Sequence, residues 1–170
     1  MREVNFQQEI ARSFRLLMPD AFYYKIPDPQ YPKRTEEGDA IRRIIPRPYD
    51  CQVIDRGKFF AIELKLHKRT TAFPIDAVKE NQLHSLQRVN ANGGTGIILI
   101  NARTRNANLI YALSVDEYLS LSQHHTRNGR KSIPYKAFAD IRHVYGRHHL
   151  PDRRYGWDVR QILNDMKGKW

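Results

Sequence analysis

The sequence contains one cysteine, Cys51, and no long apolar stretch. A single cysteine excludes an internal disulfide and a zinc site built from several cysteines, and it is typical of a reducing compartment. Apolar runs such as Ile97–Ile100 are far shorter than the ~20 residues that cross a bilayer. Residues 1–5 also lack the apolar stretch of a secretory signal. We therefore expect an intracellular protein with no membrane partner.

Acidic residues are in short supply as well. Asp and Glu total 18 against 29 Lys and Arg, which gives a net charge of +11 and a pI near 9.9. Such an excess favours a polyanionic partner, of which nucleic acid is the commonest. A basic surface that serves solubility, or one that docks on an anionic membrane, would have a similar composition. The sequence has no basic helix with a strong apolar face, so a nucleic-acid partner is favoured.

The length of 170 residues suits a single domain, 1–170, with a sizeable core. Apolar residues at helical spacing predict a first helix over 6–17, and residues 22–26 read as a strand. Residues 27–47 are polar, basic and dotted with proline, which predicts a short basic arm. Residues 136–170 are interpreted as a basic C-terminal tail that ends in a last helix.

Several local signals place the remaining elements. We expect a second helix to begin at Pro74–Asp76, with Asp76 as its N-cap, and to end at a glycine pair after Asn92. Ser114 and Glu117 form a capping box for a third helix through about residue 121, with a basic loop after it. Two buried strands are expected at 95–101 and 108–113. This order of elements predicts an α/β fold with a mixed central β-sheet flanked by helices.

A hairpin in the middle of the chain brings acidic residues together. A two-residue turn at Arg56–Gly57, counted outward, places Asp50 opposite Glu63. Side chains directly opposite in an antiparallel pair share a face, with Cβ atoms about 5 Å apart. Lys65 follows Glu63 by two positions and therefore lies on the same face. Two carboxylates this close repel each other unless a cation lies between them.

Two acids and a lysine on one strand face suggest a metal-dependent phosphodiesterase site. Carboxylates that hold Mg²⁺ neutralise phosphate charge and activate water, and a nearby lysine stabilises charge on the phosphate oxygens. Asp50, Glu63 and Lys65 supply these groups. The alternative is a surface hairpin with solvated charges. Against that alternative, Phe60, Ile62 and Leu64 form an apolar face that leaves the charged residues together on the other.

Two residues outside the hairpin are further candidates. Gln82 lies within the apolar stripe of the second helix, where a buried amide must find partners. Its carbonyl is a candidate metal ligand, and the alternative is a core glutamine satisfied by the backbone. Glu9 lies on the flank of the first helix's apolar face. It either reaches the site as another acid or pairs with Arg12 or Arg15 on the surface.

The basic residues are spaced as expected for contacts to a nucleic-acid backbone. Contacts to phosphates set affinity without reading sequence. Each of these residues is also open to interpretation as a solvated surface charge. The candidate DNA-binding residues are Arg42, Arg43, Arg47, Lys68, Arg69, Arg130 and Lys131.

The hairpin motif resembles that of the PD-(D/E)xK nuclease superfamily, with Asp50 followed by Glu63-Leu64-Lys65. Further segments resemble the RecU-type Holliday-junction resolvases within it. Those segments are Tyr31-Pro32-Lys33-Arg34, the hairpin through Lys65, Thr71-Ala72-Phe73-Pro74, Glu80-Asn81-Gln82-Leu83, Gly93-Gly94-Thr95-Gly96-Ile97 and Arg130-Lys131-Ser132-Ile133-Pro134-Tyr135. Their order matches that of the family from about residue 23 to 135.

The resemblance implies a restriction-endonuclease-like fold and a homodimeric, Mg²⁺-dependent enzyme, with Mn²⁺ able to substitute, that nicks opposing strands of a four-way DNA junction. It implies that Asp50, Glu63 and Gln82 hold the metal and that Lys65 stabilises the transition state. Glu9 would correspond to an acid in the family's N-terminal helix. The sequence departs from the family at Pro48, where a hydroxyl residue is common, and in its shorter arm.

Two alternatives to junction resolution remain open from the sequence. One is a related nuclease of the same superfamily that acts on flaps, ends or duplex DNA. The other is a non-catalytic DNA-binding module of recombination that keeps the fold. The presence of Asp50, Glu63 and Lys65 together disfavours the second alternative.

Overall fold

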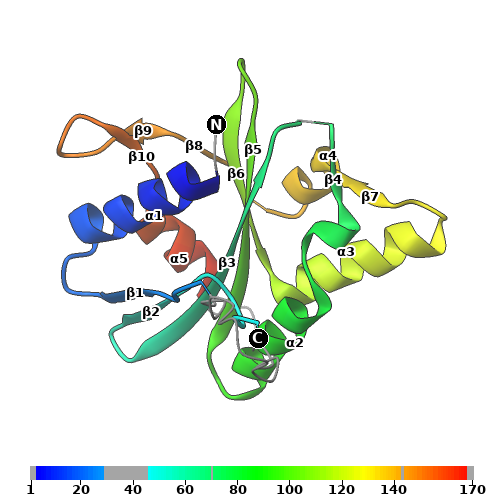
Figure 1. Cartoon of the computed structure of the whole chain (residues 1–170), viewed down its shortest axis with the longest axis horizontal. Helices are drawn as coiled ribbons and strands as arrows, with labels where there is room; N and C mark the ends of the chain where they lie inside the picture. The colour runs from blue at the N-terminus through cyan, green and yellow to red at the C-terminus, as the bar shows by residue number, and fades with distance from the viewer. Residues whose placement is uncertain (1–2, 29–45, 70, 143, 168–170) are drawn as a thin grey trace, which may run out of the picture.

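The computed structural model describes residues 3–28, 46–69, 71–142 and 144–167. These residues form a six-stranded sheet in the order β1-β2-β3-β5-β6-β8, with helices on both faces (Figure 1). Only the β3–β5 pair is parallel among the described strands. The predicted mixed sheet flanked by helices is confirmed. The strands of this sheet are β1 (Phe22–Lys25), β2 (Cys51–Asp55), β3 (Lys58–His67), β5 (Thr95–Arg103), β6 (Asn108–Ser114) and β8 (Val144–Gly146).

The β2–β3 hairpin has the predicted turn and register. Arg56 and Gly57 both have positive φ, 49° and 77°, as a type I′ turn requires. This turn twists in the same sense as the two strands and so fixes their pairing. Asp55 pairs with Lys58, and the pairing continues outward to Cys51 and Ile62. The next positions outward are those of the two predicted acids.

One face of the sheet is covered by α1 (Glu3–Leu17) and α5 (Val159–Met166), on the left in Figure 1. In the predicted stripe of α1, Phe6, Ile10 and Phe14 are buried in this core and Leu17 is partly buried. Trp157 is also fully buried, and its ring packs edge-on against Phe6 with centroids 6.2 Å apart. The C-terminal segment therefore contributes a large part of this core. It also forms β8 and a small ribbon of β9 (His148–His149) and β10 (Tyr155–Gly156).

The opposite face is covered by three helices, on the right in Figure 1. They are α2 (Glu80–Ala91), α3 (Val115–Arg127) and α4 (Tyr135–Ala139). Leu86 of α2, Tyr118 of α3 and Phe138 of α4 are fully buried in this second core. A ribbon of β4 (Ala72–Pro74) and β7 (Ser132–Pro134) joins these helices to the sheet. The central strands β3 and β5 are thus packed on both faces.

Two predicted helix boundaries are wrong. Asp76 lies in a short 3-10 turn, η1 (Ile75–Ala77), and Val78 is extended, so α2 begins at Glu80. The backbone N–H of Lys79 donates to Gln82 Oε1 at 3.0 Å, which caps α2 in place of Asp76. The third helix has the predicted capping box but continues to Arg127, beyond the predicted end at Leu121. Its last turns are mainly polar and solvent-facing, so apolar spacing does not reveal them.

The predicted basic arm, 27–47, lies mostly outside the described residues, as do Arg42 and Arg43. Within the part of the chain that the structure describes, no helix is long and apolar enough to cross a membrane.

Candidate active site

Asp50 directly precedes β2, at the open end of the hairpin, where β3 continues beyond its pairing with β2. Its backbone N–H donates to Ile62 O at 3.1 Å, the last bond of the antiparallel ladder. Pro48, two residues earlier, has no N–H with which to extend this ladder. The Asp50 side chain instead pairs with the next backbone N–H of β3, because its Oδ2 accepts the N–H of Leu64 at 2.7 Å. This bond fixes one oxygen of a carboxylate that is 1% exposed.

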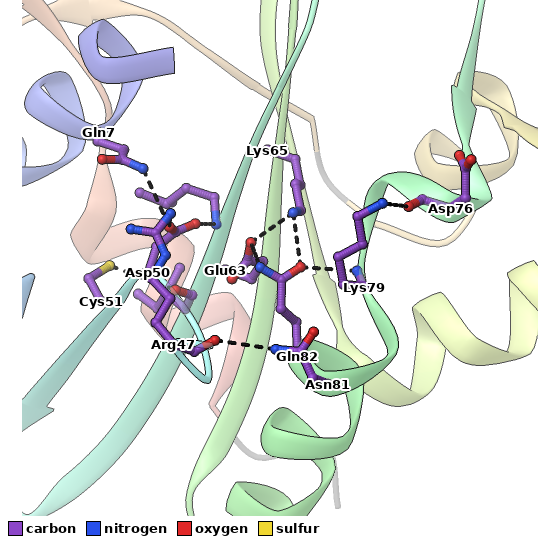
Figure 2. A network of polar contacts seen from close by, with 12 residues as sticks. Gln7, Arg47, Asp50, Cys51, Glu63, Lys65, Asp76, Lys79, Asn81 and Gln82 are labelled. Atoms are coloured by element: carbon purple, nitrogen blue, oxygen red, sulfur yellow. Dashed lines mark hydrogen bonds and ion pairs between the residues drawn. The ribbon is translucent and has the colours of Figure 1, made fainter. Parts of the chain in front are cut away.

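The second oxygen of Asp50 receives two further donors (Figure 2). Arg47 Nη2 lies 2.6 Å from Oδ1, and Gln7 Nε2 of α1 donates to the same atom at 3.3 Å. The other guanidinium nitrogen of Arg47 contacts Asp28. Sequence reasoning assigned Arg47 to DNA and did not consider Gln7. Gln7 is a polar residue within the buried stripe of α1, the same signal that revealed Gln82.

Glu63 faces α2 from the middle of β3 and is also 1% exposed. Its Oε1 lies 2.9 Å from Lys65 Nζ and accepts from Gln82 Nε2 at 2.7 Å. Its Oε2 is buried and has no hydrogen-bond partner among the described residues. A buried carboxylate oxygen without a partner is costly, because water is lost and nothing replaces it. Glu63 Oε2 is therefore an acceptor to which no described residue donates.

The electrostatics of the pair favour a cation. Burial, followed by the charge of Asp50, raises the pKa of Glu63 from 4.5 to about 8, and Lys65 offsets part of this rise. A divalent cation beside Oε2 would supply the missing partner and relieve the repulsion. The described residues contain no group of three or more His, Cys, Asp and Glu side chains at metal-binding spacing. Two carboxylates nevertheless fit Mg²⁺, which is commonly held by one or two carboxylates with water and substrate phosphate.

Gln82 lies in the first turn of α2 and joins the two halves of the site. Its Oε1 accepts from Lys65 Nζ and from the backbone N–H of Lys79, each at 3.0 Å, while its Nε2 faces Glu63. Both donors would have to move before this oxygen could bind a metal. In this arrangement Gln82 holds Glu63 and Lys65 in position and caps the helix at the same time.

Glu9 lies apart from these contacts. Its carboxylate accepts from Arg103 at 2.6 Å and from Trp157 Nε1 at 3.2 Å, with Arg147 at 3.5 Å. Among the described residues, its partners are Arg103, Arg147 and Trp157, and they include neither the acids of the site nor the predicted surface partners Arg12 and Arg15. Glu9 thus ties α1 to the C-terminal segment, and Gln7 is the α1 side chain that contacts the site.

The candidate DNA-binding residues fall into separate groups. Lys68 and Arg69 are exposed just after β3, and Arg130 and Lys131 are exposed just before β7. These two pairs lie at opposite ends of the β4–β7 ribbon, because β4 and β7 run antiparallel. Ile75 N–H donates to Lys131 O at the far end. Arg47 belongs to neither pair, since it lies against Asp50.

Comparison with known proteins gives relatives of one kind. A Holliday junction resolvase RecU of Geobacillus sp. (strain WCH70) is 32% identical over 85 residues, covering 50% of this chain and 41% of that protein. The RecU of Leuconostoc mesenteroides is 31% identical over 117 residues, covering 69% of this chain and 55% of that protein. That of Lactiplantibacillus plantarum is 28% identical over 154 residues, covering 84% and 71%. The chain thus spans about half the length of the first two relatives.

A solved structure of a Holliday junction resolvase from Archaeoglobus fulgidus aligns with 69% of this chain and 75% of that chain, with a TM-score of 0.40 and 11% identity, which is too distant to bear on function. The family model described as recombination protein U matches residues 47–148, more than half of the chain, and includes Asp50, Glu63, Lys65 and Gln82. The chain therefore belongs to the RecU family.

Proposed function

We propose that this chain is a metal-dependent endonuclease that resolves four-way DNA junctions by paired nicks in opposing strands. The observation that carries the proposal is the buried pair of Asp50 and Glu63, with Lys65 at 2.9 Å from Glu63 Oε1 and no partner for Glu63 Oε2 among the described residues. The names of the RecU relatives support four-way DNA as the substrate. The net charge of +11 suits a DNA backbone.

Asp50 and Glu63 are the proposed holders of Mg²⁺, with Mn²⁺ expected to substitute. When bound, the metal neutralises the charge of the scissile phosphate and activates a water. Lys65 Nζ, fixed between Glu63 and Gln82, is placed to stabilise the negative charge that builds on the phosphate oxygens. Gln82 and Gln7 keep the two carboxylates in position. A homodimer is proposed because two opposing strands must be cut by two sites.

The test is a cleavage assay with labelled four-way junction, flap and linear duplex, each in Mg²⁺ and in chelator. Symmetric nicks in the junction that require metal are the expected result. Equal cutting of linear duplex would contradict junction selectivity and favour a nuclease for flaps, ends or duplex. Tight binding without any cutting would favour the non-catalytic DNA-binding module.

A Glu63→Gln variant tests the site itself. It keeps the shape and the buried hydrogen bonds but removes the charge that the cation requires, so cutting should fall at least ~100-fold while junction binding persists. Glu80→Gln makes the same chemical change at an exposed position of α2 and should cut normally. Undiminished cutting by Glu63→Gln in folded protein would rule out the assignment.

A further inference from the structure

Arg47 forms an ion pair with one oxygen of Asp50. Nη2 of its guanidinium lies 2.6 Å from Asp50 Oδ1 (Figure 2). Nη1 contacts a second carboxylate, that of Asp28. The Arg47 side chain is 21% exposed, whereas Asp50 is 1% exposed. Arg47 therefore neutralises the charge of Asp50, which is far more buried than its other partner, Asp28. The expectation that Arg47 contacts DNA does not account for this contact.

Arg47 and a divalent cation would compete for the same oxygen of Asp50. Oδ2 already accepts the Leu64 N–H at 2.7 Å, so a cation at Asp50 would need Oδ1, which lies 2.6 Å from Arg47 Nη2. Asp28, Asp50 and Glu63 carry three negative charges when ionised, against two positive charges on Arg47 and Lys65, so a divalent cation would make the set positive. Like charges in a poorly hydrated site repel strongly, so we expect Arg47 to withdraw from Asp50 when the cation binds.

Arg47 is the cation that is able to leave. Lys65 projects from the middle of β3 and is also held by Gln82 Oε1 at 3.0 Å. Arg47 lies in a segment without regular structure, and its other partner, Asp28, is 72% exposed. An ion pair with so exposed a residue contributes little to stability, so releasing it costs little. Withdrawal of Arg47 therefore needs no change in the sheet.

The backbone of Arg47 is nevertheless fixed beside the site. Its carbonyl oxygen accepts from Asn81 Nδ2 of α2 at 3.4 Å, and Asn81 directly precedes Gln82. A guanidinium that leaves Asp50 therefore stays close to the site, because its backbone remains beside α2. Its fork of N–H donors matches the oxygens of a phosphate as well as those of a carboxylate.

We propose that Arg47 competes with the divalent cation for Asp50 and, once displaced, contacts the DNA phosphate next to the one that is cut. The second half of this inference depends on the proposed nuclease function, and the first half does not. Arg47 is thereby a positioning residue: it keeps the acid pair neutral without metal and turns toward DNA when metal binds.

Mn²⁺ binding measured by calorimetry without DNA tests the competition. Arg47→Ala should bind Mn²⁺ at least ~5-fold more tightly than the natural protein, because ~5-fold is the worth of an exposed ion pair and the competing pair involves a buried carboxylate. Arg47→Lys, which keeps the charge but has no fork to span two carboxylates, should fall between them. Thermal unfolding of each variant verifies that the fold is retained.

Lys79→Ala is the matched control for loss of one positive charge. Lys79 Nζ contacts a backbone oxygen of Asp76 and neither carboxylate. Loss of the Lys79 charge would change Mn²⁺ affinity only through long-range electrostatics. At about 1 M salt, where screening acts within about 3 Å, any gain in Mn²⁺ affinity in Lys79→Ala should therefore vanish, while the gain in Arg47→Ala persists. Mn²⁺ affinity that is unchanged or lower in Arg47→Ala overturns the competition, as does an equal gain in Lys79→Ala at high salt.

The DNA half has its own readout. At saturating Mn²⁺, Arg47→Ala should cut junctions about 10-fold more slowly and bind them with a smaller salt dependence, by about one phosphate contact. Cutting and salt dependence equal to those of the natural protein would overturn the phosphate contact. Tight Mn²⁺ binding in Arg47→Ala with no cutting by any form of the protein would refute the nuclease function and leave the competition intact.

Discussion

At the scale of single residues, the site is organised around unequal treatment of two acids. Asp50 is satisfied at both oxygens, by Leu64 N–H on one and by Arg47 and Gln7 on the other. Glu63 is satisfied at one oxygen and has no partner at the other within the described part of the chain. Among the described residues, Glu63 Oε2 is therefore the carboxylate oxygen of the pair that is open to a further partner, whereas both oxygens of Asp50 are already engaged.

The raised pKa of Glu63 gives a pH prediction for the metal-free protein. Its pKa of about 8 in the folded state exceeds the ordinary 4.5, chiefly because of burial, so the folded state keeps a proton that the unfolded state has lost. Between about pH 4.5 and 8, stability should therefore fall as pH rises, by at most ~1.4 kcal/mol per pH unit for one proton. Urea unfolding in chelator at several pH values measures this loss.

Glu63→Gln separates this residue from other titrating groups. The amide does not ionise, so the difference in unfolding free energy between natural protein and variant should shrink or reverse with rising pH. A difference that is flat between about pH 5 and 8 would contradict the raised pKa. Mg²⁺ should oppose the loss at higher pH, because the cation binds the ionised carboxylate.

The acids and the lysine of the site could be predicted from the sequence, whereas the contacts of Gln82 and Arg47 could not. Asp50, Glu63 and Lys65 were placed together from a turn and a period of two, and the structure brings all three together. Gln82 was identified because a polar residue interrupts an apolar stripe. Its amide orientation was not predicted, because its Oε1 accepts from the Lys79 N–H at the true start of α2, which leaves Nε2 to face Glu63, and that helix start was placed wrongly. Arg47 at Asp50 depends on the path of an irregular segment, and no periodic pattern encodes it.

At the scale of elements, α2 and β3 must pack closely for the site to exist. Gln82 reaches Glu63 only because α2 lies against β5, the neighbour of β3. Gly96 of β5 permits this approach, since a Cβ there would lie 2.8 Å from Leu86 O and 2.9 Å from Leu86 Cβ. Asn90 completes the contact, because its Oδ1 accepts the Gly96 N–H at 2.7 Å.

Gly96→Ala should therefore damage both stability and the site. The added methyl meets helix backbone that cannot rotate away, so we expect a loss of ~1–3 kcal/mol, as for other overpacked cores. Movement of α2 would lengthen the 2.7 Å contact between Gln82 and Glu63 and reduce cutting even where the protein is folded. Gly146→Ala, where an added Cβ meets no atom within 4 Å, is the control. Equal behaviour of the two variants would argue against this packing.

Elements were predicted correctly where a few adjacent residues specify them, and wrongly where a boundary depends on contacts with another element. The hairpin and the Ser114–Glu117 capping box are specified by a few adjacent residues, and both are present. The start of α2 was misplaced because Pro74–Asp76 supplies a start signal that only a short 3-10 turn uses. The helix proper starts where Gln82 satisfies Lys79 N–H, and Gln82 is held in turn by Glu63 on another element.

At the scale of the whole molecule, the C-terminal segment and the N-terminal helix form one unit beneath the sheet. Glu9 accepts from Arg103 and Trp157, and Ser13 Oγ accepts the backbone N–H of Trp157 at 3.0 Å. This links positions that are 144 residues apart in the chain. Gln7 lies on the same helix, so the C-terminal segment helps to hold the side chain that contacts Asp50.

Charge distribution is the other property of the whole molecule. The net charge of +11 predicts junction binding that weakens steeply with salt, because bound phosphates release their counterions. Each phosphate contact contributes about 0.9 to the slope of log affinity against log salt. The exposed pair of Lys68 and Arg69 at the end of β3 and the pair of Arg130 and Lys131 before β7 are the described candidates for such contacts.

Replacing either pair by alanine should lower the salt slope by about 1 to 2 and weaken binding to all junction sequences alike, since phosphates carry no base identity. Fluorescence anisotropy with the Glu63→Gln background measures binding without cutting. Lys58→Ala, an exposed lysine at the opposite end of β3 from Lys68, is the control for a general loss of charge. If one pair lowers the slope and the other behaves like Lys58→Ala, the DNA lies along one end of the β4–β7 ribbon. If neither pair differs from the control, the phosphate contacts come from elsewhere on the chain, and the basic pairs are solvated charges.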